Sequence, residues 1–271
     1  MIKKLKRFIK NINNKYFYGK YKSSYDYMNK KTNIREYLLM FVFIFAISLS
    51  FLYLVFNNVL YSIIFSFAFT IFFINEVILN SKKLNYENYI LSQLTIYTSQ
   101  TSLLNSYNNV YSSLNEVIKF LDYPVKDDLK KVIKKIDSGM TISDSFKEFN
   151  AKYDNRTITL FNQTLELFDE HGNSDAEQVL QIISDEMNTL KIKKDKFLKY
   201  KKEWRLNFYI VTILSLVMPL ILKFMIADIY HGFMDSFGLY VMSAILLINL
   251  VIIKKVELVF RNQEIGEKGY D

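Results

Sequence analysis

Four long runs without a charged residue constrain this chain more than any other feature of its sequence. They are Tyr37–Phe56, Asn57–Asn75, Leu206–Leu222 and Ser236–Ile253. Each is close to the roughly 17 to 25 residues that a helix needs to cross a hydrocarbon core of about 30 Å. We therefore predict an integral membrane protein with four transmembrane helices, arranged as two hairpins.

Residues that break helices are scarce along the whole chain. Its 271 residues include only seven glycines and two prolines, and no segment alternates apolar and polar residues as a half-buried strand does. The predicted fold class is therefore all-α. We expect a basic tail at 1–36, a first transmembrane hairpin at 37–79, a helical bundle with a basic juxtamembrane helix at 80–205, a second hairpin at 206–253, and a second tail at 254–271.

The net charge of +8 is concentrated at the N-terminus. Residues 1–36 carry eleven cations and two anions, whereas residues 80–205 are almost balanced. Cytoplasmic loops of membrane proteins carry such an excess of lysine and arginine. We therefore expect both termini and the bundle to be cytoplasmic, and we expect no nucleic acid as a partner.

The N-terminal tail divides into two parts. Residues 1–12 mix apolar and basic residues, a pattern typical of a helix lying on an anionic lipid surface. A frayed basic tail explains this pattern equally well. Residues 13–35 show no clear period, and we predict that they are poorly ordered.

Six segments of different lengths lie between the two hairpins, and each carries one apolar face. This pattern predicts a six-helix bundle inserted between the hairpins. The expected core positions of the first five are Ile90, Leu94, Tyr97, Thr101 and Leu104; Val110, Leu114, Val117, Ile118 and Leu121; Val125, Leu129, Val132, Ile133 and Ile136; Ile142, Phe146 and Phe149; and Ile158, Phe161, Leu165 and Phe168.

The sixth segment, Ser174–Leu222, begins with a capping-box pattern, in which Ser174 and Glu177 can satisfy each other's backbone donors. Its expected core positions are Val179, Ile183, Met187 and Leu190. No glycine or proline follows until Pro219, so the segment reads as one helix, or two nearly continuous helices, that pass from water into the bilayer. A soluble coiled coil is disfavoured because Leu206–Leu222 is apolar on every face.

Eight cations occupy Lys191–Arg205, directly before the third span. Those nearest the span are expected among anionic lipid headgroups, together with the only tryptophan: Lys201, Lys202, Trp204 and Arg205. The earlier ones lie beyond a Debye length of about 8 Å from the headgroups. We therefore assign Lys191, Lys193 and Lys194 to partner binding.

Three residues are predicted to have structural roles. Gly139 and Gly172 each follow an apolar helical pattern, where a left-handed C-cap favours glycine. Pro219 is expected to kink the third span because it removes a backbone donor.

The sequence lacks a recognisable catalytic centre. It has no cysteine and no glycine-rich phosphate loop, so we expect neither an enzyme nor a cofactor. His171 reads as a helix-terminal cation. A metal site at Asp228, His231 and Asp235 is a weaker interpretation than an ordinary polar hairpin loop.

Several carboxylates also have a simple interpretation. Asp127, Asp128, Glu148, Asp169 and Glu170 read first as solvated faces of the bundle. Glu76, near the end of the second span, is expected to reach toward the cytoplasm. A buried proton-relay carboxylate is the alternative interpretation of Glu76.

Two stretches anchored by glycine carry a resemblance to a known family. They are Ile136–Phe146 (IDSGMTISDSF) and Leu165–Asn173 (LELFDEHGN), followed by Val179–Ser184 and by Pro219 in the third span. Together with the order of hairpin, bundle, basic helix and hairpin, they resemble the type II secretion F-domain family, especially the platform proteins of Tad-type and type IV pili.

This resemblance implies a non-enzymatic platform of a pilus or secretion machine in the inner, cell membrane of a prokaryote. The implied partners are a cytoplasmic hexameric secretion ATPase, pilin-like subunits, and a paralogous platform protein or a second copy of the chain. A multi-span transporter or channel component is the alternative, and it requires polar groups or broken helices within the spans. A membrane-bound enzyme is a third class, and it requires a reactive cluster.

Overall fold

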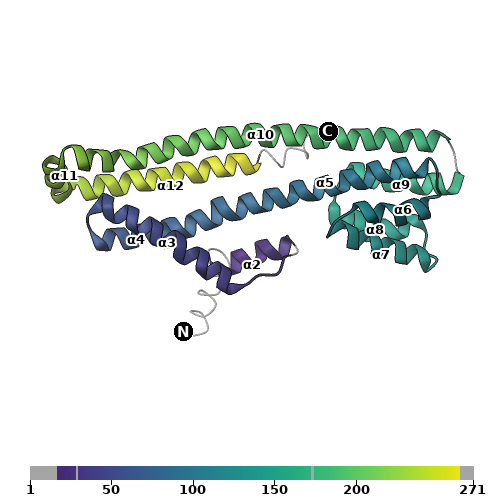
Figure 1. Cartoon of the computed structure of the whole chain (residues 1–271), viewed down its shortest axis with the longest axis horizontal. Coiled ribbons are helices and arrows are strands. Elements are labelled where there is room, and N and C mark those ends of the chain that lie inside the picture. Colours follow the sequence, from purple (N-terminus) through teal and green to yellow (C-terminus); the bar gives the residue numbers. More distant parts are fainter. Residues whose placement is uncertain (1–16, 29, 172–173, 263–271) are drawn as a thin grey trace. The chain divides into compact units, whose positions relative to one another are not determined.

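The computed structural model describes residues 17–28, 30–171 and 174–262, and these residues are almost entirely helical (Figure 1). No strand occurs among them, so the all-α prediction is confirmed. Four helices are long and apolar enough to cross a membrane: Ile34–Phe56, Val59–Asn105, Asp175–Met225 and Leu239–Val259.

The chain forms two compact units. We call Met1–Leu84 with Lys201–Asp271 the span unit, and Asn85–Tyr200 the globular unit. Two helices contribute residues to both units, namely α5 (Leu79–Asn105) and α10 (Ser174–Met225). The sequence left open whether Ser174–Leu222 forms one helix or two nearly continuous helices, and the structure shows one helix with Pro219 inside it.

The first hairpin of the span unit turns within two residues. Helix α3 (Ile34–Phe56) ends at Asn57, which adopts a left-handed conformation, and Asn58 caps the start of α4 (Val59–Phe72) by accepting from the backbone of Leu60 and Tyr61. Asparagine tolerates positive φ and is a favoured N-cap, so this pair suits both positions. Asn57 and Asn58 therefore form the turn between α3 and α4.

A stripe of small polar residues faces inward on α4. Ser62, Ser66 and Thr70 are fully buried, and Ser48 of α3 lies 3.4 Å from Thr70, measured between their hydroxyl oxygens. Ser62 and Thr70 also donate to backbone carbonyls one turn earlier. Small side chains let two helices approach closely in a membrane, and these local hydrogen bonds satisfy the hydroxyls of Ser62 and Thr70.

The second hairpin of the span unit contains a further short helix. Helix α10 is followed by α11 (Ala227–Phe233), a π-helical turn η3 (Met234–Gly238) and α12 (Leu239–Asn262). The prediction of a polar loop at 228–235 is therefore wrong, because these residues are helical. Apolar side chains of α11 and η3, including Tyr230 and Met234, pack against Leu52, Val55 and Phe56 and so order the segment.

Side chains of the second hairpin also complete the end of α3. Lys223 donates to the carbonyl of Leu54 at 2.8 Å, and the hydroxyl of Tyr230 donates to the carbonyl of Val55 at 2.5 Å. The last four carbonyls of any helix lack intrahelical partners. Two of those at the end of α3 are thus satisfied by residues far along the chain.

Residues 13–35 differ from the prediction of poor order where the structure describes them. Tyr18–Tyr27 form helix α2, in which Tyr21 and Tyr25 are buried and stack on each other with ring centroids 4.3 Å apart. Tyr21 also packs against Tyr37 of α3. The absence of a regular apolar period concealed this helix, because tyrosine supplies its buried face. Residues 1–12, with their basic pattern, lie outside the described residues.

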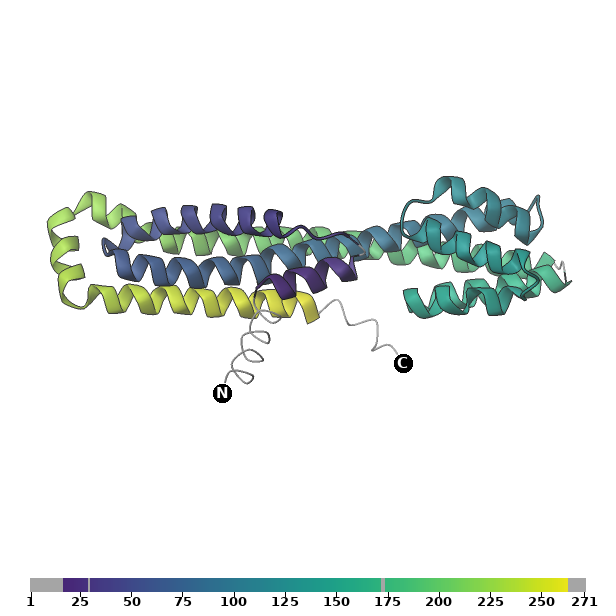
Figure 2. The same ribbon diagram turned by 90° about the horizontal axis from the view of Figure 1, so that it is seen from below.

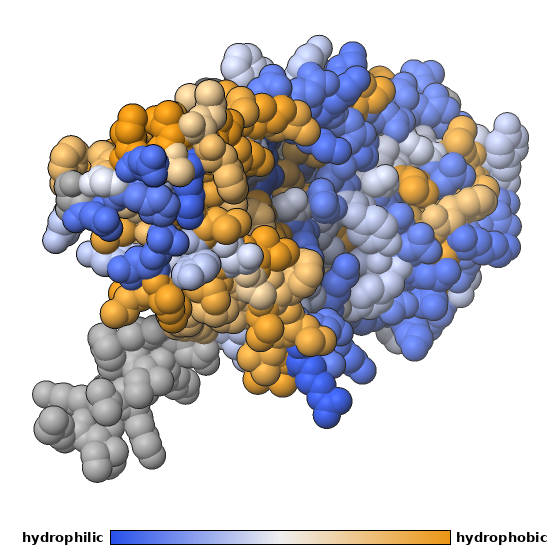
Figure 3. Space-filling model, turned by 60° about the vertical axis from the view of Figure 1, so that its left-hand side comes forward, coloured by the Kyte–Doolittle hydropathy of each residue, from blue (hydrophilic) through white to orange (hydrophobic). Residues whose placement is uncertain are grey.

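Apolar residues cover much of the surface of the span unit, whereas hydrophilic residues predominate on the globular unit (Figure 3). A water-soluble domain rarely exposes such continuous apolar area. This surface is consistent with a multi-pass membrane protein.

The globular unit is built from parts of α5 and α10 and from four further helices with one short 3₁₀ turn (Figures 1 and 2). These elements are α6 (Val110–Val117), η2 (Ile118–Phe120), α7 (Val125–Asp137), α8 (Ile142–Tyr153) and α9 (Arg156–His171). One apolar cluster joins them, with its central members on every helix: Leu94, Tyr97, Leu114, Leu129, Phe146, Phe161, Leu165, Leu180 and Met187.

The residues of α5 to α9 that face this core are those predicted from the sequence, whereas one position of α10 differs from the prediction. Val179 is 42% exposed, and its neighbour Leu180 is fully buried instead. Leu180, Ile183 and Met187 share a face at offsets of three and seven residues, which fits the helical period as well as the face that starts at Val179. Both faces carry apolar residues, so periodicity alone did not choose between them.

Candidate functional site

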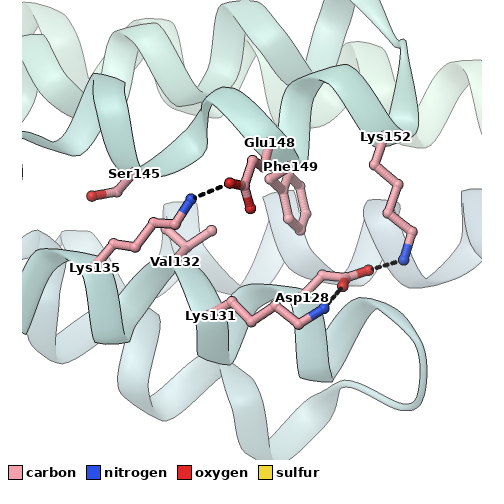
Figure 4. A pocket seen from close by; sticks show the side chains of 8 residues that line it. All are labelled: Asp128, Lys131, Val132, Lys135, Ser145, Glu148, Phe149 and Lys152. Carbon is pink, nitrogen blue, oxygen red and sulfur yellow. Dashed lines mark hydrogen bonds and ion pairs between the residues drawn. The ribbon is translucent and has the colours of Figure 1, made fainter.

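A charged pocket lies between α7 and α8 on the globular unit (Figure 4). It has a volume of about 140 Å³. Its walls are formed by the following residues: Asp128, Lys131, Val132, Lys135, Ser145, Glu148, Phe149 and Lys152. Val132 and Phe149 are buried and belong to the apolar core, so they provide an apolar floor beneath charged walls.

Asp128 is the centre of one hydrogen-bond network in this pocket. Its carboxylate accepts from Lys131 at 2.8 Å, from Lys152, and from the hydroxyl of Tyr153 at 2.8 Å. The Asp128 side chain is 10% exposed, whereas that of Lys131 is 66% exposed. A buried carboxylate is therefore held by donors that come from both helices.

The protonation states of Asp128 and Tyr153 follow from this arrangement. Burial alone raises the pKa of Asp128, but the hydrogen bonds from Lys131, Lys152 and Tyr153 outweigh it and hold the pKa below its ordinary value. Burial and the hydrogen bond to Asp128 raise the pKa of Tyr153. Asp128 is thus an anion and Tyr153 a neutral donor at physiological pH.

The second charge pair in the pocket is looser. Lys135 of α7 lies 3.0 Å from Glu148 of α8, and the Glu148 side chain is 78% exposed. Exposed pairs of this kind contribute about 0 to 1 kcal/mol. Glu148 can therefore leave Lys135 at little cost.

The prediction that Asp128 belongs to a solvated face is wrong. Asp128 lies one turn after Val125 and one turn before Val132, so it borders the apolar face of α7. A helical projection of α7 carries this signal, because a carboxylate at the edge of an apolar face requires partners when the helix packs. The partners on α8, Lys152 and Tyr153, are not visible from the spacing within α7.

The residues assigned to partner binding on α10 differ in their surroundings. The ammonium group of Lys191 contacts both carboxylate oxygens of Asp195 at 2.7 and 2.8 Å and the Asn88 side chain of α5 at 3.2 Å. This contact holds the pKa of Asp195 below its ordinary value. Lys191 therefore helps to join α5 and α10, while Lys193 is exposed and Lys194 is partly exposed.

The residues assigned to the lipid headgroups also divide. Trp204 is 72% exposed and Lys202 is exposed, whereas Lys201 is only 6% exposed. Arg205 is directed toward α12, where its Nε lies 2.8 Å from the carboxylate of Glu257. The hydroxyl of Tyr209 also donates to Glu257, whose side chain is 4% exposed. Arg205 thus joins α10 to α12 within the span unit.

The three residues with predicted structural roles have separate outcomes. Gly139 follows α7 with φ of +88°, and the amides of Gly139 and Met140 donate to Ile136 and Lys135. This is the left-handed C-cap that the sequence predicts. Gly172 lies outside the described residues. Pro219 occurs within α10, which continues to Met225.

Glu76 lies in a π-helical turn, η1 (Phe73–Ile78), between α4 and α5. Its carboxylate lies 3.2 Å from Lys20 of α2. The side chain of Asn80 donates to the backbone carbonyl of Glu76 at 2.8 Å. The ion pair with Lys20 of α2 therefore explains why a carboxylate can lie at Glu76. The spacing of residues in the sequence could not predict this pair, because its members are 56 positions apart.

Groups of three metal-ligating side chains do not occur among the described residues. Asp228, His231 and Asp235 lie on α11 and η3 without forming such a group. The His171 side chain lies outside the described residues.

Comparisons with known proteins give no match: no family model, no curated protein and no solved structure is similar to this chain at a significant level. Function must therefore be argued from the geometry of the two units.

Proposed function

We propose that this protein is a non-enzymatic platform in a prokaryotic cell membrane, serving a pilus or secretion machine. In this proposal a six-helix bundle, formed by the globular unit, meets a hexameric secretion ATPase in the cytoplasm. The spans contact pilin-like subunits and a second copy or paralogue of the chain. The platform couples the ATPase to the movement of those subunits into or out of the membrane.

One observation carries the proposal. A hydrophilic unit with its own core lies in the sequence between two pairs of apolar helices, and α5 and α10 each supply residues to both units without a break in the helix. A continuous helix of 52 residues, such as α10, is roughly 80 Å long. Such a helix is suited to passing an axial displacement from a soluble partner to a span.

Topology is part of the same proposal. Both termini and the globular unit are placed in the cytoplasm, because the cation excess lies beside the first span. The exposed cations of α10 are the proposed contact with the ATPase. Of the three assigned lysines, Lys193 and Lys194 fit this role best, since Lys191 is occupied within the globular unit.

A transporter or channel component is the second candidate, and polar groups in the second span favour it. Ser62, Ser66 and Thr70 are buried there, and a π-helical turn follows. However, the hydroxyls of Ser62 and Thr70 donate to carbonyls of their own helix. This pattern is typical of close helix packing, and it leaves these two hydroxyls satisfied without a substrate.

Co-purification tests the proposal. The full chain, extracted from membranes in mild detergent, is expected to retain the secretion ATPase of the same organism, and in cells it should crosslink to a pilin-like subunit. Loss of pili or secreted product on deletion of the gene is expected as well. Failure of the ATPase and the pilin-like subunits to associate with the chain, with pili unaffected by deletion, contradicts the proposal.

A further inference from the structure

Charge is distributed unevenly over the globular unit. Residues 157–190 contain no lysine or arginine but seven carboxylates: Glu166, Asp169, Glu170, Asp175, Glu177, Asp185 and Glu186. Helices α7 and α8 together carry seven lysines and five carboxylates, and one of those carboxylates, Asp128, is buried and neutralised. The carboxylates are therefore concentrated on α9 and the first part of α10, whereas α7 and α8 are rich in lysine.

The acidic first part of α10 also has an exposed apolar face. Ile182 is 65% exposed and Val179 is 42% exposed. Asp185 and Glu186 follow Ile182 by three and four residues, so they flank it on the same side of the helix. Both are exposed, and neither forms an ion pair with any residue in the described part of the chain. We call Val179, Ile182, Asp185 and Glu186 the acidic face of α10.

The pocket between α7 and α8 has the complementary chemistry. Its walls offer Lys131, Lys135 and Lys152, and its floor is formed by Val132 and Phe149 (Figure 4). The exposed carboxylate of Glu148 already occupies one of these lysines at 3.0 Å. Glu148 thus stands where a carboxylate from another molecule can bind, and the exchange of one exposed pair for another costs little.

The two surfaces cannot meet within one molecule. In the globular unit, α7 lies on the opposite side of α5 and α9 from α10 (Figure 1). Helices α7, α8 and α10 contribute other residues to the same apolar core, which holds the two surfaces apart. A contact between them therefore requires two copies of the chain.

We propose that the globular units of two copies associate head to tail, with the acidic face of α10 from one copy bound in the α7–α8 pocket of the other. Ile182 lies against the apolar floor, and Asp185 and Glu186 pair with Lys131 and Lys135. Because each copy presents both surfaces, the contact is heterologous, and repetition closes a ring or extends a row. This contact deepens the proposed function, since it names the surfaces by which platform copies assemble.

Cysteine crosslinking of the full chain in detergent tests the contact directly, because the natural chain has no cysteine to give a background. Proteins carrying Lys131→Cys and Glu186→Cys are mixed and treated with a short bifunctional maleimide. A crosslinked dimer is expected from the mixture but not from either protein alone. The matched control is Lys147→Cys mixed with Glu186→Cys, because Lys147 lies on α8, one of the two helices that form the pocket, but does not line the pocket.

Charge reversal provides the second arm. Lys131→Glu with Lys135→Glu, or Asp185→Lys with Glu186→Lys, is expected to weaken self-association at least about tenfold, as loss of close charge pairs at an interface does. Mixing the two variants should restore it, and Lys147→Glu should leave it unchanged. Added salt should weaken association of the natural chain.

Three results would overturn this inference: no dimer above the control pair, equal crosslinking of either variant alone, or no rescue by mixing. Reversals that weaken ATPase binding but not self-association would also reject it and assign the pocket to another protein. The crosslinking and self-association measurements use the purified chain without ATPase or pilin-like subunits. A failure here is therefore distinct from a failure of the platform proposal.

Discussion

Asp128 is a carboxylate with donors from two helices around it, and its effect on stability depends on pH. Its pKa in the folded chain is below the ordinary value of 3.8. A group with a depressed pKa contributes stability that is complete above its ordinary value and is lost as the pH falls through the folded value. The globular unit should therefore lose stability below about pH 4.

Replacement of Asp128 by asparagine is the first prediction. Asp128→Asn should lower the free energy of unfolding by about 1 to 3 kcal/mol at pH 7, because Lys152 and Tyr153 lose a charged acceptor. The difference in melting temperature between the natural chain and the variant should shrink at pH 3. Asp127→Asn is the matched control, since Asp127 is 53% exposed and contacts Lys130 only at 3.7 Å. Equal effects of the two substitutions would contradict the role of Asp128.

Gly139 gives a second prediction, which depends on backbone conformation alone. A side chain at this position meets no atom within 4 Å, but φ is +88°. A β-branched residue is disfavoured there by on the order of 1 to 2 kcal/mol. Gly139→Val should therefore lower the melting temperature of the full chain, whereas Gly139→Asn should have a smaller effect because asparagine tolerates positive φ. Unchanged melting of the valine variant would show that α7 ends elsewhere.

Two glycines of the second hairpin give a third prediction. A Cβ at Gly238 would lie 2.6 Å from the backbone carbonyl oxygen of Phe233, whereas one at Gly232 meets nothing within 4 Å. Gly238→Ala should destabilise the span unit by about 1 to 3 kcal/mol, as overpacking does. Gly232→Ala should be neutral or stabilising because alanine favours helix. Thermal unfolding in detergent measures the stability of both variants. A Gly238→Ala variant as stable as the natural chain would contradict the close packing of Gly238 against Phe233.

At the scale of elements, the long helix α10 changes its surroundings along its length. Its first part belongs to the globular core through Leu180, Ile183 and Met187, and its last part is the third apolar span. Between them, Lys191 and Arg205 are held by Asp195 and Glu257. The cations of Lys191–Arg205 therefore have different surroundings, and reversing their charge should have different effects at different positions.

The fourth prediction concerns this stretch. Lys193→Glu with Lys194→Glu should reduce co-purification of the ATPase while leaving melting temperature and membrane insertion unchanged. Arg205→Glu should instead destabilise the span unit by about 3 to 5 kcal/mol, because it places a second carboxylate beside the buried Glu257. Pull-down and protease accessibility separate the two effects. Identical behaviour of both variants would contradict the separate roles of the two lysines and Arg205.

Helices and their buried faces were predictable from the sequence where a single pattern, such as an uncharged run or a regular apolar spacing, marked them. Uncharged runs located the four long apolar helices, and the spacing of Leu129, Val132 and Ile133 placed the core face of α7. Helix α2 was missed because its buried face is made of tyrosine, which also suits exposed positions. The α7–α8 pocket was missed because Asp128, Lys152 and Tyr153 meet only after two helices pack, and sequence spacing does not encode that packing.

At the scale of the whole molecule, topology is the fifth prediction. Tyr107 is 89% exposed on the globular unit, and Asp228 is exposed on α11. In intact cells, an impermeant thiol reagent should label Asp228→Cys but not Tyr107→Cys, because the globular unit is proposed to be cytoplasmic. Both should be labelled after the cells are opened. Labelling of Tyr107→Cys in intact cells would contradict the proposed orientation.

The hydrogen bonds at the end of α3 also impose an order on biosynthesis. The carbonyls of Leu54 and Val55 are satisfied by Lys223 and Tyr230, which lie 169 and 175 residues later in the chain. At about 5 to 20 residues per second, the ribosome needs about 9 to 35 s to reach those donors. During that interval the first hairpin must leave these carbonyls to water or lipid headgroups, because an unsatisfied carbonyl in hydrocarbon costs several kcal/mol. The first hairpin therefore inserts in an unfinished state, and the arrival of the second hairpin completes it.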